Sequence, residues 1–273
     1  MENFKQYLDS IYPRTSRATS SYLKAISILD KLFLQRDVFN LNAKSLFEIK
    51  NPVLMERIID YVDQEEDKYR KNEDSIFVLV NPNQTSYPKK RFCTAAIHAL
   101  GRYVNIMAED EAAVLMVASQ SSGRNLSKKL IQKFQIDNLG SEREVRAKHR
   151  VGQDIFRALL LRNYHKRCCL TGIDIPDVLR ASHIIPWSES VRNRLNPENG
   201  LCLSATYDAA FDKHLISLDE DYRLILSPTI KEYYTSEAFK VHFLKLEGKM
   251  IEMPDMYLPS RQFLNEHRNK LII

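Results

Sequence analysis

Four residues between positions 183 and 212 combine side chains and spacing that suit hydrolytic chemistry. His183 lies in a short apolar stretch, Ser-His-Ile-Ile, which predicts a strand, and an imidazole can act as a general base near neutral pH. Asn199 lies in a Pro-Glu-Asn-Gly turn, from which it could orient that base. Asp208 and Asp212 are four residues apart, hence on one face of a helix. These are the parts of a metal-assisted hydrolase, and two carboxylates suit Mg²⁺ or Mn²⁺.

Each of these residues also has a structural interpretation. A single histidine in an apolar strand is more often a packing residue than a catalyst, and two aspartates at this spacing usually lie on a solvated helix surface. Their occurrence together with Asn199, in this order, favours the catalytic interpretation of His183.

The composition is that of a soluble protein with room for two modest domains in 273 residues. No apolar run is long enough to cross a membrane, and the start of the chain does not resemble a signal peptide, so a cytoplasmic location is expected. The four cysteines include no C-x-x-C pair and are interpreted as reduced thiols. A structural zinc site is not expected; the alternative is a site with Cys168 or Cys169, Cys202 and a histidine.

The positive charge is concentrated in one segment. Residues 141 to 170 contain eight Lys/Arg and three acidic residues, an excess equal to the net charge of +5 for the whole chain. Such clustering favours a polyanion as partner, although a solvated helix face is the alternative.

Apolar spacing predicts a helical region from residue 1 to about 106. Pro52 is expected to open one of its helices, whereas residues 75–80 are too short and too uniformly apolar to assign. A further helix is predicted from about Pro88, where Lys89 and Lys90 could contact phosphate or simply form a basic surface patch.

Residues 109–135 are predicted to form two more helices, parted at SSGRN. The polar segment DNLGSERE then marks a domain boundary, with a helical domain at 1–140 that binds DNA or a partner and a second domain at 141–273. The second domain is expected to begin with a helix from about Arg143 to Tyr164.

From about Glu144 onward the chain resembles the HNH, or ββα-metal, nucleases, in the restriction-endonuclease-like branch with helical domains ahead of the nuclease module. The pieces that carry the resemblance are RVGQDIFRALLLRNY (150–164), CCLTG (168–172), ASHIIPW (181–187), NPENGLCLS (196–204), YDAAFD (207–212), LEGKMIEMP (246–254) and NEHR (265–268). The resemblance implies a ββα fold with His183 as general base, Asn199 as the residue that orients it, and Asp208 and Asp212 as metal ligands.

The chain departs from that pattern near the expected metal. Ser182 stands where Asp or His is common, and Tyr207 stands near the position of the closing histidine, so the ligand set is incomplete. Thr171 replaces the second cysteine of a zinc pair, and Lys213-His214 replaces a basic-Gly pair.

Four arginines are candidates for phosphate contacts. Arg192 and Arg194 lie in the loop between the two predicted strands, where arginines are also often merely solvated. Arg150 and Arg157 share a helix face and could reach phosphate or carboxylates of the fold itself.

The sequence thus predicts an α+β protein, with a helical N-terminal domain followed by an HNH module wrapped by helices. The predicted function is a Mg²⁺- or Mn²⁺-dependent endonuclease for double-stranded DNA, in restriction or related phage defence. A DNA-binding or effector module with a decayed site and an RNA-cleaving nuclease are the alternatives. A double-strand cut would need a homodimer or two visits. The recognition sequence and any dependence on base modification are not readable from the sequence.

Overall fold

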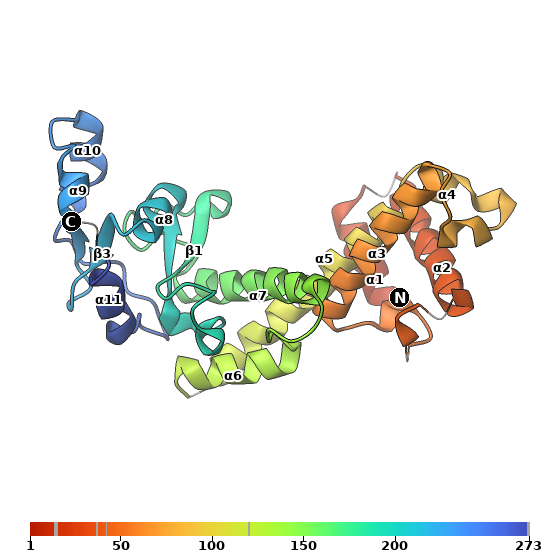
Figure 1. The fold of residues 1–273 in the computed structure, drawn as a ribbon, viewed down its shortest axis with the longest axis horizontal. Helices are drawn as coiled ribbons and strands as arrows, with labels where there is room; N and C mark the ends of the chain where they lie inside the picture. The colour runs from red at the N-terminus through yellow and green to blue at the C-terminus, as the bar shows by residue number, and fades with distance from the viewer. Residues whose placement is uncertain (14–15, 37, 42, 120, 272–273) are drawn as a thin grey trace. The chain divides into compact units, whose positions relative to one another are not determined.

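The chain folds into two compact units (Figure 1). The computed structural model describes residues 1–13, 16–36, 38–41, 43–119 and 121–271. The first unit consists of Met1–Asp110 and Leu139–Val151, and the second of Glu111–Asn138 and Gly152–Ile273. The two units do not correspond to a single boundary at residue 140, because residues 111–138 belong to the second unit and residues 139–151 to the first. Domains 1–140 and 141–273 as independently folding pieces stay a prediction.

Helices build the first unit around one apolar core. The core includes Phe4, Leu29, Ile58, Phe77 and Leu100, all at most 2% exposed. The elements are α1 (Glu2–Ile11), α2 (Ala18–Arg36), α3 (Pro52–Arg70), α4 (Ser86–Lys89) and the first part of α5 (Phe92–Ala118), with 3₁₀ turns at Val38–Asn40, Leu46–Glu48, Ile76–Leu79 and Pro82–Gln84.

The start of α3 follows the expected capping chemistry. The side-chain oxygen of Asn51 accepts a hydrogen bond of 3.0 Å from the amide of Leu54, and Pro52 occupies the first helical position. Asn51 is favoured because its side chain accepts from an N–H that a helix start leaves without a partner, and Pro52 is favoured because proline has no such N–H. The prediction that Pro52 opens a helix is confirmed.

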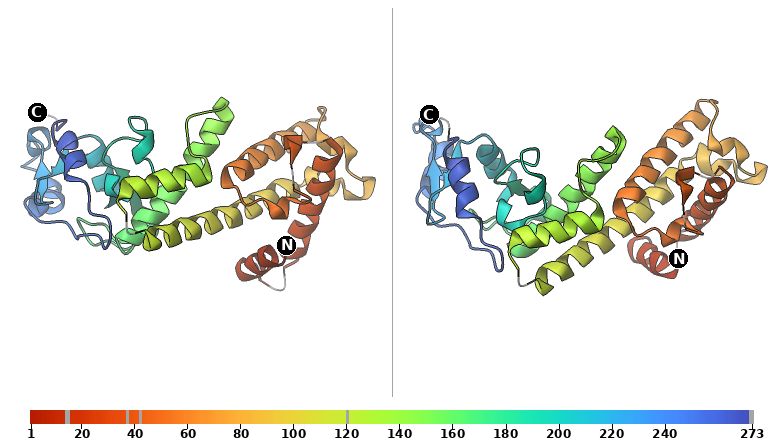
Figure 2. Two further views of the ribbon diagram at one scale, coloured as in Figure 1. Left: turned by 90° about the horizontal axis from the view of Figure 1, so that it is seen from below. Right: turned by 60° about the horizontal axis from the view of Figure 1, so that its bottom comes forward.

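The helix predicted from about Pro88 is two helices, and no separate helix starts at residue 109. Arg91 has a φ of 60°, in the left-handed region, which separates α4 from α5. From there α5 runs without interruption to Ala118 (Figure 2). The stretch 102–118 contains no glycine or proline that would end a helix, so the polar residues near Glu109 lie within it.

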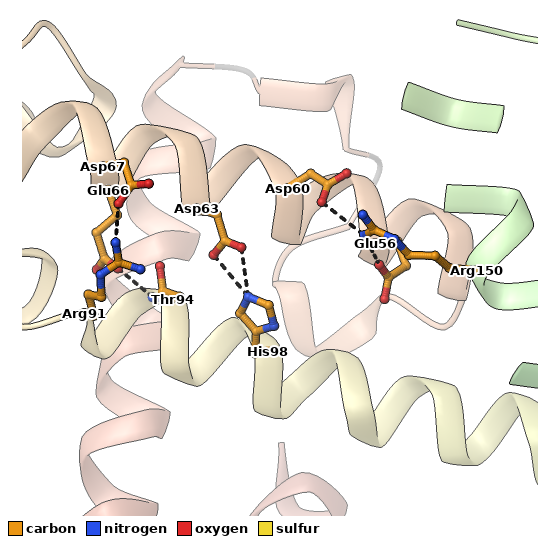
Figure 3. A network of polar contacts seen from close by, with 9 residues as sticks. All are labelled: Glu56, Asp60, Asp63, Glu66, Asp67, Arg91, Thr94, His98 and Arg150. Atoms are coloured by element: carbon orange, nitrogen blue, oxygen red, sulfur yellow. Dashed lines mark hydrogen bonds and ion pairs between the residues drawn. The ribbon is translucent and has the colours of Figure 1, made fainter. Parts of the chain in front are cut away.

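A row of polar contacts fastens α3 to neighbouring helices of the first unit (Figure 3). Asp63 holds the imidazole Nε2 of His98 at 2.9 Å, and the carboxylate raises the pKa of His98. The other pairs are Asp67 with Arg91, Glu66 with the amide of Thr94, and Glu56 and Asp60 with Arg150.

The second unit contains a ββα motif. Strand β1 (Leu179–His183) pairs antiparallel with β2 (Gly200–Ser204), and α8 (Ala205–Asp212) follows β2 directly. A second hairpin joins β3 (Ile216–Leu218) and β4 (Leu224–Leu226). The other helices are α6 (Gly123–Phe134), α7 (Glu142–Asn163, of which the part from Gly152 belongs here), α9 (Pro228–Lys231), α10 (Glu237–His242) and α11 (Arg261–Arg268), with 3₁₀ turns at Pro176–Val178, Val191–Asn193, Pro197–Asn199 and Leu244–Leu246.

Two glycines allow α7 to lie close against the ββα motif. A side chain at Gly152 would overlap the ring of Trp187, and one at Gly200 would come within 2.7 Å of Phe156 Cζ. Because real Cβ atoms essentially never approach other atoms this closely, both positions favour glycine.

The chain is therefore an α+β protein, as predicted, with a helical N-terminal part followed by a ββα motif. The helix predicted from about Arg143 is also confirmed as α7. Within the described ranges, no helix is long and apolar enough to cross a bilayer.

Candidate active site

His183 is half-buried at the end of β1, and two aromatic rings hold its imidazole. Phe156 of α7 stacks on it with ring centroids 3.7 Å apart and planes 15° apart, and Trp187 meets it edge-on at 5.6 Å. Its Nε2 lies 3.0 Å from the main-chain oxygen of Arg194. Because a carbonyl oxygen only accepts hydrogen bonds, Nε2 carries the proton in the neutral ring. The basic lone pair is then on Nδ1.

Asn199 is fully buried in the turn before β2, and its side chain bonds to the loop between the strands. Its Oδ1 accepts from the amide of Ile185 at 2.8 Å, while Nδ2 donates to the carbonyls of Ile185 at 3.0 Å and Asn193 at 3.2 Å. Its own carbonyl accepts from the amide of Ile184 at 3.0 Å. Asn199 thus braces the loop whose Arg194 carbonyl contacts His183, so any orienting effect on the imidazole passes through the main chain.

Asp208 and Asp212 face the same cleft as His183. The cleft has a volume of about 660 Å³ and lies entirely within the second unit. Burial of the carboxylate raises the pKa of Asp212, and the negative charge of Asp208 raises it further. The lining is completed by Gln153, Asp154, Phe156, Arg157, Arg180, Ala181, Ser182, Pro186 and Trp187.

A hydrated divalent cation fits these two carboxylates. A cation held by Asp208 and Asp212 would offset both the burial and the like charge that raise the pKa of Asp212, and Mg²⁺ is usually held by one or two carboxylates, with water and phosphate as the other ligands. Over the described part of the chain, no three His, Cys, Asp or Glu side chains gather as a set that could hold a metal ion. An all-protein cage is therefore not what these residues offer.

The two strands, the loop between them and α8 lie in the segment that matches a known protein family. Residues 168–219 match the HNH endonuclease family. The match supports a nuclease hydrolase that acts on nucleic acid, and it includes His183, Asn199, Asp208 and Asp212. No curated protein matches the chain.

The matched residues 168–219 (the HNH segment) do not include every residue that lines the cleft. Phe156, Arg157 and Asp154 come from α7, upstream of the segment. Neither Phe156 nor Asp154 is among the site residues that the sequence predicts. The sequence signals for this part of α7 are the resemblance carried by residues 150–164 and the helix face that Arg150 and Arg157 share.

Of the two departures from the HNH pattern, Tyr207 has a structural role other than ligation, whereas Ser182 is simply buried. The hydroxyl of Tyr207 donates a hydrogen bond of 2.6 Å to the carbonyl of His242 and ties α8 to α10. Burial raises the pKa of this phenol, which keeps it neutral. Ser182 is 2% exposed, and its hydroxyl has no hydrogen-bond partner among the described residues.

Two of the arginines predicted to contact phosphate are used by the fold. Arg157 donates to the carbonyls of Leu179 at 2.8 Å and Pro176 at 2.7 Å, at the start of β1. Arg194 is 6% exposed, and burial lowers its pKa. Its guanidinium lies over the Trp187 ring at 4.8 Å, and its donors bond to the Trp187 carbonyl and to Asn138.

The remaining predicted cations lie outside the cleft lining. Arg192 is exposed on the loop between the strands of the HNH segment. In the first unit, Arg150 is paired with Glu56 and Asp60, whereas Lys89 and Lys90 are exposed. Arg150 thus pairs with carboxylates of the fold itself, which is one of the two roles predicted for it from sequence.

All four cysteines are buried and none forms a disulfide. Cys169 and Cys202 meet through their main chains, with a hydrogen bond of 2.8 Å from the Cys169 amide to the Cys202 carbonyl. Burial raises the pKa of the Cys202 thiol to about 12. These buried, unpaired thiols agree with the interpretation of the cysteines as reduced thiols.

Proposed function

We propose that the protein is a divalent-metal-dependent DNA endonuclease that acts in the cytoplasm in restriction or related phage defence. The observation that carries the proposal is that a histidine with its basic Nδ1 defined by the Arg194 carbonyl lines one cleft with Asp208 and Asp212. A base and two carboxylates are the groups that phosphodiester hydrolysis needs from the protein.

In the proposed reaction, a water oxygen attacks phosphorus, the P–O bond to the leaving oxygen breaks, and Nδ1 of His183 takes the proton of the water. The imidazolium that forms keeps its Nε2–H on the Arg194 carbonyl, whose negative end stabilises the new charge. Asp208 and Asp212 would hold the metal ion, which when bound supplies positive charge against the charge that develops on the phosphate.

Nicking of supercoiled plasmid DNA with Mg²⁺ or Mn²⁺ tests the proposal. We expect the wild type to nick, and His183→Ala and Asp208→Ala to lose cleavage while their circular dichroism stays unchanged. Full activity of Asp208→Ala would remove the ligand assignment. Cleavage of RNA alone would replace DNA as the substrate. Because one ββα site cuts one strand, we expect nicked plasmid before linear plasmid unless the protein acts as a homodimer.

A DNA-binding module that does not cut is the second candidate. Ser182 and Tyr207 favour it, since a serine hydroxyl is a poor metal ligand and the Tyr207 hydroxyl donates to the carbonyl of His242. Tight, salt-sensitive binding of DNA without nicking in any divalent metal would select this candidate.

A further inference from the structure

Helix α6 lies upstream of the HNH segment and has one strongly basic face. Its inner side is closed by Leu126, Leu130 and Phe134, which are at most 4% exposed. The helix contains no acidic residue. Its cations are Arg124, Lys128, Lys129 and Lys133, all exposed.

This helix is docked on the loop between the two strands of the HNH segment. The hydroxyl of Ser127 donates to the carbonyl of Arg192 at 2.8 Å, and the amide of Gly123 donates to Oε1 of Glu198 at 3.1 Å. A side chain at Gly123 would overlap Asn196 and lie 2.9 Å from Glu198 Cδ, so only glycine permits this approach. The position of α6 on the loop is therefore specified by its sequence.

Three cations on this surface are not used by the fold. Lys133 pairs with Glu111 at 2.7 Å, and Arg124 lies over the ring of Phe263. Across the described ranges, Lys128, Lys129 and Arg192 have no ion-pair partner. They come from two elements that the bond between Ser127 and the Arg192 carbonyl holds together. Unpaired cations on adjoining rigid elements are suited to a row of phosphates.

The same loop connects this surface to the candidate base. Its Asn193 carbonyl accepts from Asn199, and its Arg194 carbonyl contacts the imidazole of His183. Arg192, whose carbonyl holds α6, directly precedes these two residues. A polyanion bound by the α6 face and Arg192 would thus be held by the loop that also positions His183.

We propose that the outer face of α6, with Lys128 and Lys129, and the side chain of Arg192 form the surface that binds the phosphate backbone of duplex DNA. The inference rests on the proposed function for the nature of the polyanion. Of the arginines predicted from sequence to contact phosphate it retains Arg192, whereas Arg157 and Arg194 donate hydrogen bonds to carbonyl and amide oxygens inside the fold.

The test is the salt dependence of binding to a fluorescein-labelled DNA duplex, measured by anisotropy without divalent metal so that no cleavage occurs. Each phosphate neutralised by a cation contributes about 0.9 to the slope of log K against log salt concentration. Lys128→Ala/Lys129→Ala should therefore reduce the magnitude of that slope by about 1.8. The two lysines are exposed, so the thermal melt should stay that of the wild type.

The matched control is Lys245→Ala/Lys249→Ala, which removes the same charge from exposed positions of the second unit. Lys245 follows α10, which lies well apart from α6 within that unit (Figure 1). The control should keep the wild-type slope. An unchanged slope in the α6 variant, or an equal fall in the control, overturns the inference while leaving the proposed function intact. A wild type that binds no duplex overturns both, and a loss seen only with an RNA hairpin overturns the choice of DNA.

Discussion

The ring of Phe156 stacks on the imidazole of His183 at 3.7 Å between centroids, although the two residues lie 27 positions apart and in different elements. Phe156 is 1% exposed in α7, upstream of the HNH segment. The stack covers one face of the imidazole and leaves it little freedom to turn. The candidate base is thus held from outside the motif that contains it.

Phe156→Leu should lower the rate of plasmid nicking by more than its loss of stability explains. Loss of the stack lets the imidazole turn away from the attacking water, and a tenfold fall in kcat corresponds to about 1.4 kcal/mol of activation free energy. Phe77→Leu is the matched control, since Phe77 is equally buried but lies in the first unit. Equal kcat values for the two variants at equal thermal melts would mean that the stack has no role in positioning His183.

Asn199→Asp should destabilise the second unit by about 2–3 kcal/mol, because two carbonyls that now accept hydrogen bonds from Nδ2 would face a carboxylate instead. Trp187 is the only tryptophan and lies in the second unit, so its fluorescence during urea unfolding reports on that unit. Asn196→Asp in the same loop loses one long bond of 3.5 Å from Nδ2 to Oδ1 of Asn193, retains the Oδ1 acceptor for the Glu198 amide, and should cost less. If the two variants unfold at the same urea concentration, the bracing role of Asn199 is wrong.

Gly152→Ala should destabilise the second unit although alanine is the better helix former. The added methyl group would push the ring of Trp187, and we expect a net cost of about 1–2 kcal/mol after the gain in helix propensity. Because Trp187 contacts His183 edge-on, the nicking rate should fall as well. Gly101→Ala in α5 is the control, since its methyl group meets mainly the flexible end of Ile59. A stabilised Gly152→Ala protein with full activity would contradict the packing argument.

His267 should make the stability of the second unit depend on pH. It is 3% exposed in α11, with Nε2 on the carbonyl of Phe211 at 3.0 Å and Nδ1 on the hydroxyl of Ser217 at 2.9 Å. Burial, together with the nearby His214, lowers the pKa of His267 from 6.5 to about 4. The unfolded chain therefore binds a proton that the folded chain does not, so stability is complete above pH 6.5 and declines as the pH falls toward 4.

Between pH 7 and pH 5 this histidine should remove about 2 kcal/mol from the free energy of unfolding. Urea unfolding followed by Trp187 fluorescence at the two pH values measures the loss. His267→Gln can make the same two hydrogen bonds without titrating, so it should show a smaller difference. The same decline in both proteins would assign the pH dependence to other groups.

Much of the fold could be predicted from residue types and their spacing. Pro52 marked a helix start and apolar spacing predicted α7, whereas the ββα motif was expected from the resemblance to the HNH nucleases. The first two features follow from local preferences and periodicity, which neighbouring residues decide. The helix predicted to start at residue 109 was wrong, because α5 contains no glycine or proline there and continues through the polar residues.

The sequence by itself determined which groups could do chemistry: a histidine on a strand, an amide in a turn and two aspartates on one helix face. Only the tertiary structure decided how those groups are held and which cations remain available. Contacts such as Phe156 on His183, or Arg157 on the Leu179 carbonyl, join residues far apart in the chain. Such contacts depend on how helices pack against the hairpin. Gly152 and Gly200 permit that packing because they have no side chain, and no local sequence pattern encodes the packing.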